Sequence, residues 1–271
     1  MKHVSHLVWF VRWLQRLGSA VLRRRKVIDL CPSFLLPRGR ILYDRRVGAI
    51  RHFEFRNQLA DYWAYDHCLA ASALDLVNFP QWKNLRARYE KMLAEGKVPV
   101  VLDCGANIGF SAYWFAVELP EALIIAVEPD ADNVKLAVRN TKFCTNVKLV
   151  QAAVASQDCR LTLTNTHMGA DAFRTVTDSE GELVGYSIAS LVNMAGGELE
   201  NLLLAKVDIE GFEHELFSAN TDWVDHSQAL VVETHDWMLP GQAGANNLLQ
   251  VISRTPRDFV THGEHIVSFR L

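Results

Sequence analysis

Stretches of apolar residues alternate with helix-compatible stretches along the second part of the chain. Five mostly apolar runs predict strands, at 98–103, 123–128, 147–152, 202–208 and 229–235. The intervening segments are compatible with helices, at 110–119, 130–140 and 242–254. Strands that alternate with helices in this way predict a mostly parallel sheet that is covered on both faces.

Two shorter patterns complete this predicted core. The chain ends with alternating residues at 259–262 and 265–269, separated by Gly263-Glu264, and this arrangement predicts a hairpin. Residues 160–164 also alternate and predict an edge strand, whereas residues 165–200 are expected to form an insertion made of loops.

The first third of the chain has a different pattern. Short mixed segments from 27 to 60 are followed by a helix-compatible stretch from 62 to 93, which is interrupted at Pro80. The polar run 94–97 then precedes the first apolar strand. We therefore expect two parts, a mainly helical N-terminal extension or cap over 1–95 and a core over 96–271.

The beginning of the extension predicts an amphipathic helix with a basic flank. Apolar residues recur at helical intervals over 6–22, at Leu7, Phe10, Leu14, Leu17 and Val21. The apolar part is interrupted by arginines and is shorter than the roughly 20 residues that span a bilayer. A basic cluster follows the apolar part, which is the wrong order for a secretory signal. The helix is expected to pack on the core; the alternative is peripheral membrane contact through 6–26.

Composition narrows the class of protein. With 271 residues, 49% of them hydrophobic, the chain can bury a large core. The net charge of −3, with both signs mixed along the chain, argues against a nucleic-acid partner. Five cysteines without a C-x-x-C pair indicate a reducing compartment and no structural zinc, so a cytoplasmic location is expected, with possible attachment to the inner face of the membrane.

The first predicted core strand ends in a glycine-punctuated turn that contains Gly105 and Gly109. The next strand ends at Glu128, about 20 residues beyond the turn, where an acid can accept hydrogen bonds from ribose hydroxyls. A dinucleotide fingerprint would require glycines at Asn107 and Phe110, so NAD and FAD are disfavoured. The turn and the acid together predict a ligand that contains a ribose.

Two later strands also end in polar residues. Asp208 and Glu210 lie at the carboxyl end of the strand at 202–208, and His235 lies at that of the strand at 229–235. Ligands of open parallel sheets bind at such strand ends. His235, beside Asp236, is the preferred histidine for proton abstraction because the unperturbed pKa of histidine is near neutrality.

Four sequence elements resemble the FkbM-type family of class I S-adenosylmethionine-dependent methyltransferases: Asp103-x-Gly105-Ala106-Asn107-x-Gly109, Val127-Glu128-Pro129, Ala152-Ala153-Val154 and Lys206-x-Asp208-x-Glu210-Gly211-Phe212-Glu213. The resemblance covers about the last two thirds of the chain. It implies a Rossmann-like α/β fold, in which a mostly parallel seven-stranded sheet carries a C-terminal antiparallel hairpin. It also implies S-adenosyl-L-methionine as cofactor and an oxygen as methyl acceptor.

The resemblance assigns roles to individual residues. In the cofactor site, backbone amides between Gly105 and Gly109 would approach the amino-acid portion, and Asp103 would hold the turn and bind the ammonium. Asn107 would add a side-chain amide, and Glu128 would bind both ribose hydroxyls. Asp208, Glu210 and His235 are the candidate catalytic residues, as general base, as orienting group or as electrostatic stabiliser.

Several alternatives stay open. Asp208, Glu233 and His235 could instead hold a metal ion, although neither a C-x-x-C nor an H-E-x-x-H pattern supports one and no metal ligand is assigned. The acceptor is expected to be a small molecule, a saccharide or a lipid-linked glycan. The leading alternative function is a non-catalytic methyltransferase-fold protein that acts at a membrane or with a protein partner. A nucleotide-sugar or NAD enzyme is a third option, disfavoured by Asn107 and Phe110.

Overall fold

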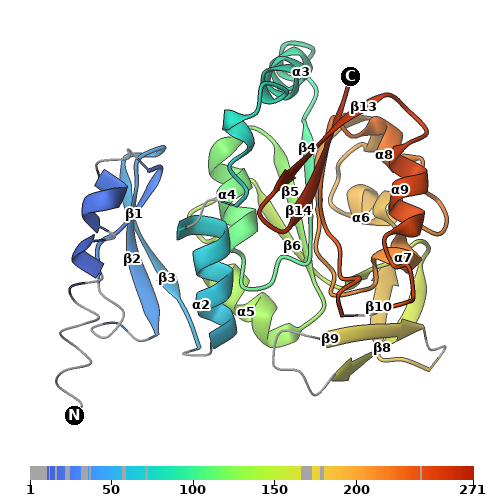
Figure 1. Ribbon diagram of the computed structural model, residues 1–271, viewed down its shortest axis with the longest axis horizontal. Coiled ribbons are helices and arrows are strands. Elements are labelled where there is room, and N and C mark those ends of the chain that lie inside the picture. The colour runs from blue at the N-terminus through green and yellow to red at the C-terminus, as the bar shows by residue number, and fades with distance from the viewer. Residues whose placement is uncertain are drawn as a thin grey trace.

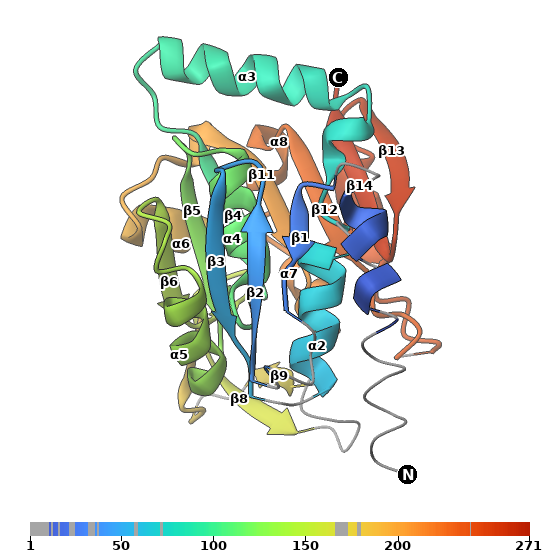
Figure 2. The same ribbon diagram turned by 90° about the vertical axis from the view of Figure 1, so that its left-hand side faces the viewer.

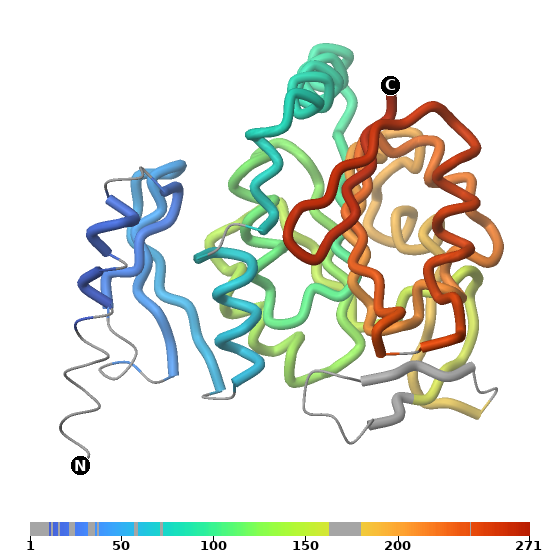
Figure 3. Tube along the Cα trace, in the orientation of Figure 1, coloured from blue at the N-terminus to red at the C-terminus, as the bar shows by residue number. Residues whose placement is uncertain are grey.

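The computed structural model places most of the chain (Figure 3). It describes residues 11–271 apart from residues 12, 16, 22–24, 32–35, 37, 57–58, 71–72, 166–172, 178–179 and 239. For residues 163–165 and 173–177 it describes the backbone only.

A seven-stranded sheet forms the centre of the molecule (Figure 1). Its strands are, in spatial order, β13 (Arg257–His262), β14 (His265–Arg270), β12 (Ala229–Glu233), β11 (Leu202–Val207), β4 (Val100–Cys104), β5 (Leu123–Glu128) and β6 (Val147–Gln151). The strands from β12 to β6 run parallel, whereas β14 is antiparallel to both of its neighbours. The predicted mostly parallel sheet with an antiparallel C-terminal hairpin is confirmed, and the last strand lies inside the sheet.

Alternating residues of the central strands pack against helices on opposite faces. Val101 belongs to one apolar cluster, with Phe110 and Trp114, whereas Val100 and Leu102 belong to the other. The helices of the first cluster are α3 (Trp82–Ala94), α4 (Phe110–Glu118) and α5 (Ala131–Asn140); those of the second are α6 (Ile188–Met194), α7 (Glu213–Leu216), α8 (Trp223–His226) and α9 (Asn246–Ile252). Because both faces are covered, the strands are apolar throughout rather than alternating.

The N-terminal extension contains a sheet that was not predicted. Its helical elements are α2 (Leu59–Tyr65), the π-helical turn η1 (Asp66–Ala70), the short 3-10 helix η2 (Leu76–Asn78) and α3. Before them, β1 (Val27–Asp29), β2 (Gly39–Asp44) and β3 (Ala49–Glu54) form an antiparallel sheet in the order β1-β2-β3. This sheet lies beside α4 and α5 in two perpendicular views (Figures 1 and 2). Phe53 of β3 makes edge contacts with Phe110 and Tyr113 of α4, at 5.5 and 4.9 Å between ring centroids.

The prediction of loops over 165–200 is wrong. A second sheet has the strand order β7-β10-β8-β9, from β7 (Ala153–Val154), β8 (Cys159–Asn165), β9 (Phe173–Thr177) and β10 (Leu183–Tyr186). Helix α6 and the 3-10 helix η3 (Leu199–Asn201) follow. The alternating residues 160–164 therefore lie in this second sheet rather than at an edge of the first. Close approach of β10 needs a small residue, because a Cβ at Gly185 would lie 2.6 Å from Leu161 Cδ1.

The described part of the N-terminal helix covers residues 11–21, without 12 and 16. Trp13 donates a hydrogen bond from Nε1 to the Asp29 carbonyl at 3.3 Å, and Ala20 is buried. Two residues of the predicted apolar face, Leu14 and Val21, are exposed instead, and Leu7 and Phe10 lie outside the described residues. None of the helices in the described part of the chain has both the length and the apolar character to cross a bilayer. Membrane contact through 6–26 stays a prediction.

Candidate active site

The turn after β4 lies directly against the end of β11. Gly105 has a φ of 81°, and a Cβ there would lie 1.7 Å from the backbone oxygen of Asp208. Gly109 has a φ of 91°, and its Cβ would lie 3.0 Å from Ala137 Cα of α5. Both positions therefore need glycine, for its backbone conformation and for space. Asn107 between them has a φ of 48°, in a region where asparagine is tolerated better than most residues.

Glu128 closes the same turn from the end of β5. Its Oε2 accepts a hydrogen bond from the Asn107 amide at 2.9 Å, and its Oε1 accepts from the Asp130 amide at 3.1 Å and from Asn133 Nδ2 at 3.0 Å. Burial raises the pKa of the Glu128 carboxyl, and these hydrogen bonds oppose the shift. The carboxylate is held in one orientation at the edge of a cavity.

Residues of several sequence motifs that were predicted separately line this first cavity. Its walls include Gly105, Asn107 and Glu128, together with residues of the Ala152-Ala153-Val154 motif. They also include Asp208 and Glu210 from the loop that follows β11. Two polar residues of its wall were not predicted from the sequence, Arg56 from the extension and Asn133 from α5. Asn133 could have been predicted, because it lies five residues beyond Glu128 in the first turn of a predicted helix. The local sequence around Arg56 contains no such signal.

Asp103 is fully buried and does not line this cavity or the second cavity described below. Its Oδ2 accepts a hydrogen bond from Ser111 Oγ at 2.6 Å, and its Oδ1 lies 3.5 Å from Lys206 Nζ. Burial raises the pKa of the Asp103 carboxyl, against the charge of Lys206. Asp103 therefore holds the turn from beneath it, and its contact with the ammonium of the cofactor stays a prediction.

Lys206 connects three groups at the strand ends. Its ammonium donates to the Gly105 carbonyl at 2.7 Å and lies 3.0 Å from Asp208 Oδ2 and 3.5 Å from Asp103 Oδ1. Burial by itself would lower the pKa of Lys206, but the charges of Asp208 and Asp103 raise it well above its usual range. The ammonium stays charged and joins the β4 turn to the end of β11.

His235 lies among four carboxyl groups. Its Nδ1 is 2.9 Å from Glu213 Oε1, and its Nε2 is 3.8 Å from Asp208, 3.7 Å from Glu210 and 3.6 Å from Glu233. Burial opposes protonation, yet the hydrogen bond and charge of Glu213, with the charges of Asp208 and Glu210, raise the pKa of His235 to about 9. The ring is therefore an imidazolium at neutral pH. This differs from the near-neutral pKa expected from sequence.

The partner of His235 also differs from its sequence neighbour. The Asp236 carboxylate accepts hydrogen bonds from the Ala245 amide, at 3.1 and 3.3 Å, and holds the loop before α9. Glu213, 22 residues before His235, takes the position beside the ring. The K-x-D-x-E-G-x-E element contained this glutamate, but its spacing did not indicate the contact.

The carboxyl groups around His235 differ in their affinity for protons. Burial and the charge of Asp208 raise the pKa of Glu210 to about 7 and that of Glu233 to about 8. Burial works in the same direction on Asp208, but Lys206 and His235 outweigh it and lower the pKa. Glu210 also has a φ of 55°, which is strained for a residue that is not glycine.

A second cavity adjoins the first. The two share Gly105, Asn107, Asp208, Glu210 and Ala60 as wall residues. The second cavity adds the catalytic candidate His235, with Lys206 and Glu233, and two tryptophans, Trp63 and Trp237. The three predicted catalytic residues are thus brought together where the two cavities meet.

The curated proteins that match the chain do so over part of their length. The FdhE protein of Escherichia coli O139:H28 is 30% identical over 123 residues, which are 45% of this chain and 37% of that protein. The FdhE homolog of Citrobacter koseri is 29% identical over 133 residues, 48% of this chain and 41% of that protein. The matched segment thus spans about two fifths of these relatives.

Solved structures that match the chain include monomeric WbdD, with a TM-score of 0.39 and 14% identity over 71% of this chain and 41% of that chain. A putative O-methyltransferase from Klebsiella pneumoniae has a TM-score of 0.39 and 10% identity over 78% of this chain and 96% of that chain. The sequence profile of the methyltransferase FkbM domain matches residues 103–266, more than half of the chain and nearly all of its core. The chain therefore belongs to the FkbM methyltransferase family.

Proposed function

We propose that the protein is an S-adenosylmethionine-dependent O-methyltransferase whose acceptor is a hydroxyl on a small molecule or a saccharide. The observation that carries the proposal is the junction of the two cavities at Gly105, Asn107, Asp208 and Glu210. A donor in the first cavity and an acceptor in the second would meet at this junction. Such alignment of two reactants is the main requirement of an in-line methyl transfer.

The wall of the first cavity fits the proposed cofactor. Glu128 offers a fixed carboxylate to ribose hydroxyls, and apolar groups of Val127, Ala152 and Phe212 offer a surface for an adenine ring. Asp208, held ionised by Lys206, supplies negative charge. When bound, S-adenosylmethionine supplies an electrophilic methyl group next to a positive sulfonium, which negative charge favours.

Glu210 is the residue we assign as proton acceptor. A hydroxyl must lose its proton as its oxygen takes the methyl group, and a base works best when its pKa is near the working pH. Glu210, with its pKa raised to about 7, meets that condition, whereas His235 is already protonated. We assign His235 the role of a fixed cation that holds Asp208 and Glu210 in place, at 3.8 and 3.7 Å.

The second cavity favours a hydroxylated acceptor over a purely apolar one. Trp63 and Trp237 contribute aromatic surface and are 64% and 70% exposed, although large aromatic side chains are usually buried. Glu233 and Glu264 contribute oxygens that can accept hydrogen bonds from hydroxyls. A saccharide presents apolar ring faces and hydroxyl edges together, and it matches both kinds of wall.

The test of the cofactor is calorimetric titration of the full chain with S-adenosylhomocysteine and, separately, with NAD. We expect micromolar binding of S-adenosylhomocysteine and none of NAD. Glu128→Ala should abolish the binding, and Asp132→Ala, a change of an exposed acid in α5, should preserve it. Absence of binding by folded protein would overturn the proposal in favour of a non-catalytic methyltransferase-fold protein. If binding is found, a screen of hydroxylated metabolites and glycans tests the acceptor.

A further inference from the structure

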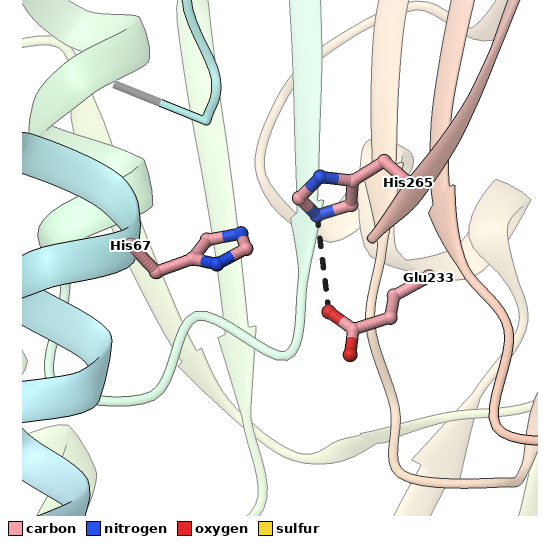
Figure 4. A group of neighbouring side chains, drawn as sticks. All are labelled: His67, Glu233 and His265. Atoms are coloured by element: carbon pink, nitrogen blue, oxygen red, sulfur yellow. Dashed lines mark ion pairs between the residues drawn. The ribbon is translucent and has the colours of Figure 1, made fainter. Parts of the chain in front are cut away.

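Two histidines and a glutamate from distant parts of the chain meet (Figure 4), and two of the three, His67 and Glu233, line the second cavity. His67 comes from η1 of the extension, Glu233 from the end of β12 and His265 from the start of β14. One ligand atom of each lies within 4.8 Å of the other two. The two imidazole rings are 5.0 Å apart between centroids, and His265 Nε2 is 3.9 Å from Glu233 Oε2.

Three of the four ring nitrogens in this cluster make no hydrogen bond of normal geometry with the described residues. His265 is 1% exposed, and neither of its ring nitrogens makes a hydrogen bond of normal geometry there, although the His262 backbone interacts with the ring. His67 Nε2 is also buried without such a hydrogen bond. Buried polar atoms are nearly always hydrogen-bonded, so three such nitrogens close together require an explanation. A bound ligand that accepts lone pairs from nitrogen would provide it.

These nitrogens differ from those of His235 in their contacts. Glu213 Oε1 lies 2.9 Å from His235 Nδ1, whereas no carboxylate of the described residues lies within hydrogen-bond distance of His67 Nε2 or of either ring nitrogen of His265. No neighbouring acid therefore competes for these nitrogens of His67 and His265.

We propose that His67, Glu233 and His265 bind one divalent transition-metal ion of the zinc type. Two imidazoles and one carboxylate are a ligand set that suits zinc and its neighbours, whereas magnesium and calcium prefer oxygen ligands alone. Bond lengths of about 2.0–2.2 Å around a tetrahedral ion place ligand atoms roughly 3.3 Å apart, so the three side chains must draw together slightly on binding. Three protein ligands leave a position for water or another oxygen.

The position of the ion gives it a role in acceptor binding, and this role rests on the proposed function. His67 and Glu233 line the second cavity, next to Asp208 and His235. An ion held there can bind an oxygen of a hydroxylated acceptor and orient it. Because His67 belongs to the extension, the ion also joins the extension to the C-terminal hairpin.

A second carboxylate and histidine group nearby is a poorer metal site. Asp208, Glu233 and His235 also have ligand atoms within 4.8 Å of one another. However, Asp208 is paired with Lys206 at 3.0 Å, and His235 is paired through Nδ1 with Glu213 at 2.9 Å. These contacts already occupy Asp208 and His235, whereas His265 Nδ1 and Nε2 have no comparable contact among the described residues. The observations therefore favour the site that contains His67 and His265.

The test is a titration of the full chain, stripped with a chelator, with Zn²⁺ by calorimetry and with Co²⁺ by visible absorption. We expect one ion per chain, with Mg²⁺ unable to compete, and d–d bands of low-coordinate Co²⁺ that Zn²⁺ abolishes. His67→Ala and His265→Ala should each lose this site. His52→Ala, a change of an exposed histidine in β3, should keep it and so controls for adventitious surface binding.

The proposal is overturned if the wild type binds no stoichiometric Zn²⁺, or if folded His67→Ala binds it as the wild type does. His67 lies in the extension, so this variant decides the matter if His265→Ala fails to fold. Binding of S-adenosylhomocysteine is measured on the same samples. Failure of the proposed function would remove that binding and leave the Zn²⁺ site, whereas failure of the metal proposal would do the reverse.

Discussion

Oε1 of the Glu213 carboxylate lies 2.9 Å from Nδ1 of His235, and both side chains are buried. The same oxygen accepts hydrogen bonds from the amides of Ile209 and Gly211, at 3.2 and 3.3 Å. A single carboxylate therefore holds both the imidazolium and the loop that carries Glu210. The relative position of the two candidate catalytic groups depends on this contact.

Replacement of that carboxylate should shift the titration of the ring. Glu213→Gln removes a buried negative charge beside His235, which destabilises the imidazolium. We expect the pKa of His235 to fall from about 9 by roughly 1 to 3 pH units. The measurement is a pH titration of ¹⁵N-labelled histidine by NMR. Glu200→Gln, at an exposed site, serves as control; an unchanged His235 titration in Glu213→Gln would contradict the assignment.

Stability should depend on pH through Glu210. Its pKa is raised to about 7 in the folded protein and is near 4.3 in an unfolded chain, so between these values the folded state holds more protons. The contribution of Glu210 to the free energy of unfolding therefore falls as pH rises from about 4.3 to about 7. The Glu210→Gln variant lacks this pH-dependent contribution.

Urea unfolding of chelator-treated wild type and Glu210→Gln, at several pH values, measures this dependence. The stability of the variant relative to the wild type should increase from about pH 4.5 to about pH 7.5 and then level off. This range spans the pKa of Glu210 in the unfolded chain, about 4.3, and in the folded protein, about 7. Glu182→Gln, at an exposed position, should show no such trend. A difference that stays flat across this range would refute the raised pKa.

Loss of the buried ammonium should destabilise the whole site. Lys206→Met leaves Asp103 and Asp208 without their cation and the Gly105 carbonyl without its donor. Breaking a buried ion pair costs about 3–5 kcal/mol of unfolding free energy. Lys83→Met, on an exposed face of α3, should stay within about 0.5 kcal/mol of the wild type. Urea unfolding measures both, and equal stabilities would show that Lys206 is not essential to the turn.

Comparison of Gly105→Ala with Gly48→Ala separates two reasons for a glycine: the close approach of neighbouring atoms and the backbone conformation. Gly48 also has a positive φ, of 61°, but a Cβ there meets nothing within 4 Å. Gly48→Ala should therefore cost about 1–2 kcal/mol, the conformational term alone. Gly105→Ala adds a Cβ that would lie 1.7 Å from the Asp208 oxygen, and it should destabilise the fold much more and abolish S-adenosylhomocysteine binding. Equal costs in urea unfolding would mean that the turn can move away from β11.

Much of the core and of the cofactor site followed from local sequence. A strand buried on both faces is a continuous apolar run, and its end is marked by the first polar residues, so the runs before Asp103 and Glu128 predicted both the strands and their functional ends. In a parallel sheet these ends lie at one edge. Glu128, Asp208 and Glu210 were therefore expected near one another, and they line one cavity.

Contacts between the core and the extension could not be predicted from local sequence. A dinucleotide fingerprint would have glycine at position 110, where this chain has phenylalanine. Only the structure shows why: Phe110 packs against Phe53 and Phe55, at 5.5 and 5.6 Å between ring centroids. The strand that carries Phe53 has too short and too mixed a pattern to be predicted, because its partners for burial lie far along the chain.

For the central sheet, the sequence by itself determined which strands form, about where they end and which side chains lie at those ends, because these properties depend on residues a few positions apart. Tertiary structure alone decided that Glu213 rather than Asp236 binds His235, and that His67 meets His265. The residues of each pair are separated by loops, and the local pattern of apolar and polar residues does not predict the path of a loop. The protonation states of their side chains follow from burial and from charges brought together by folding, so they could be assigned only once the chain's path was known.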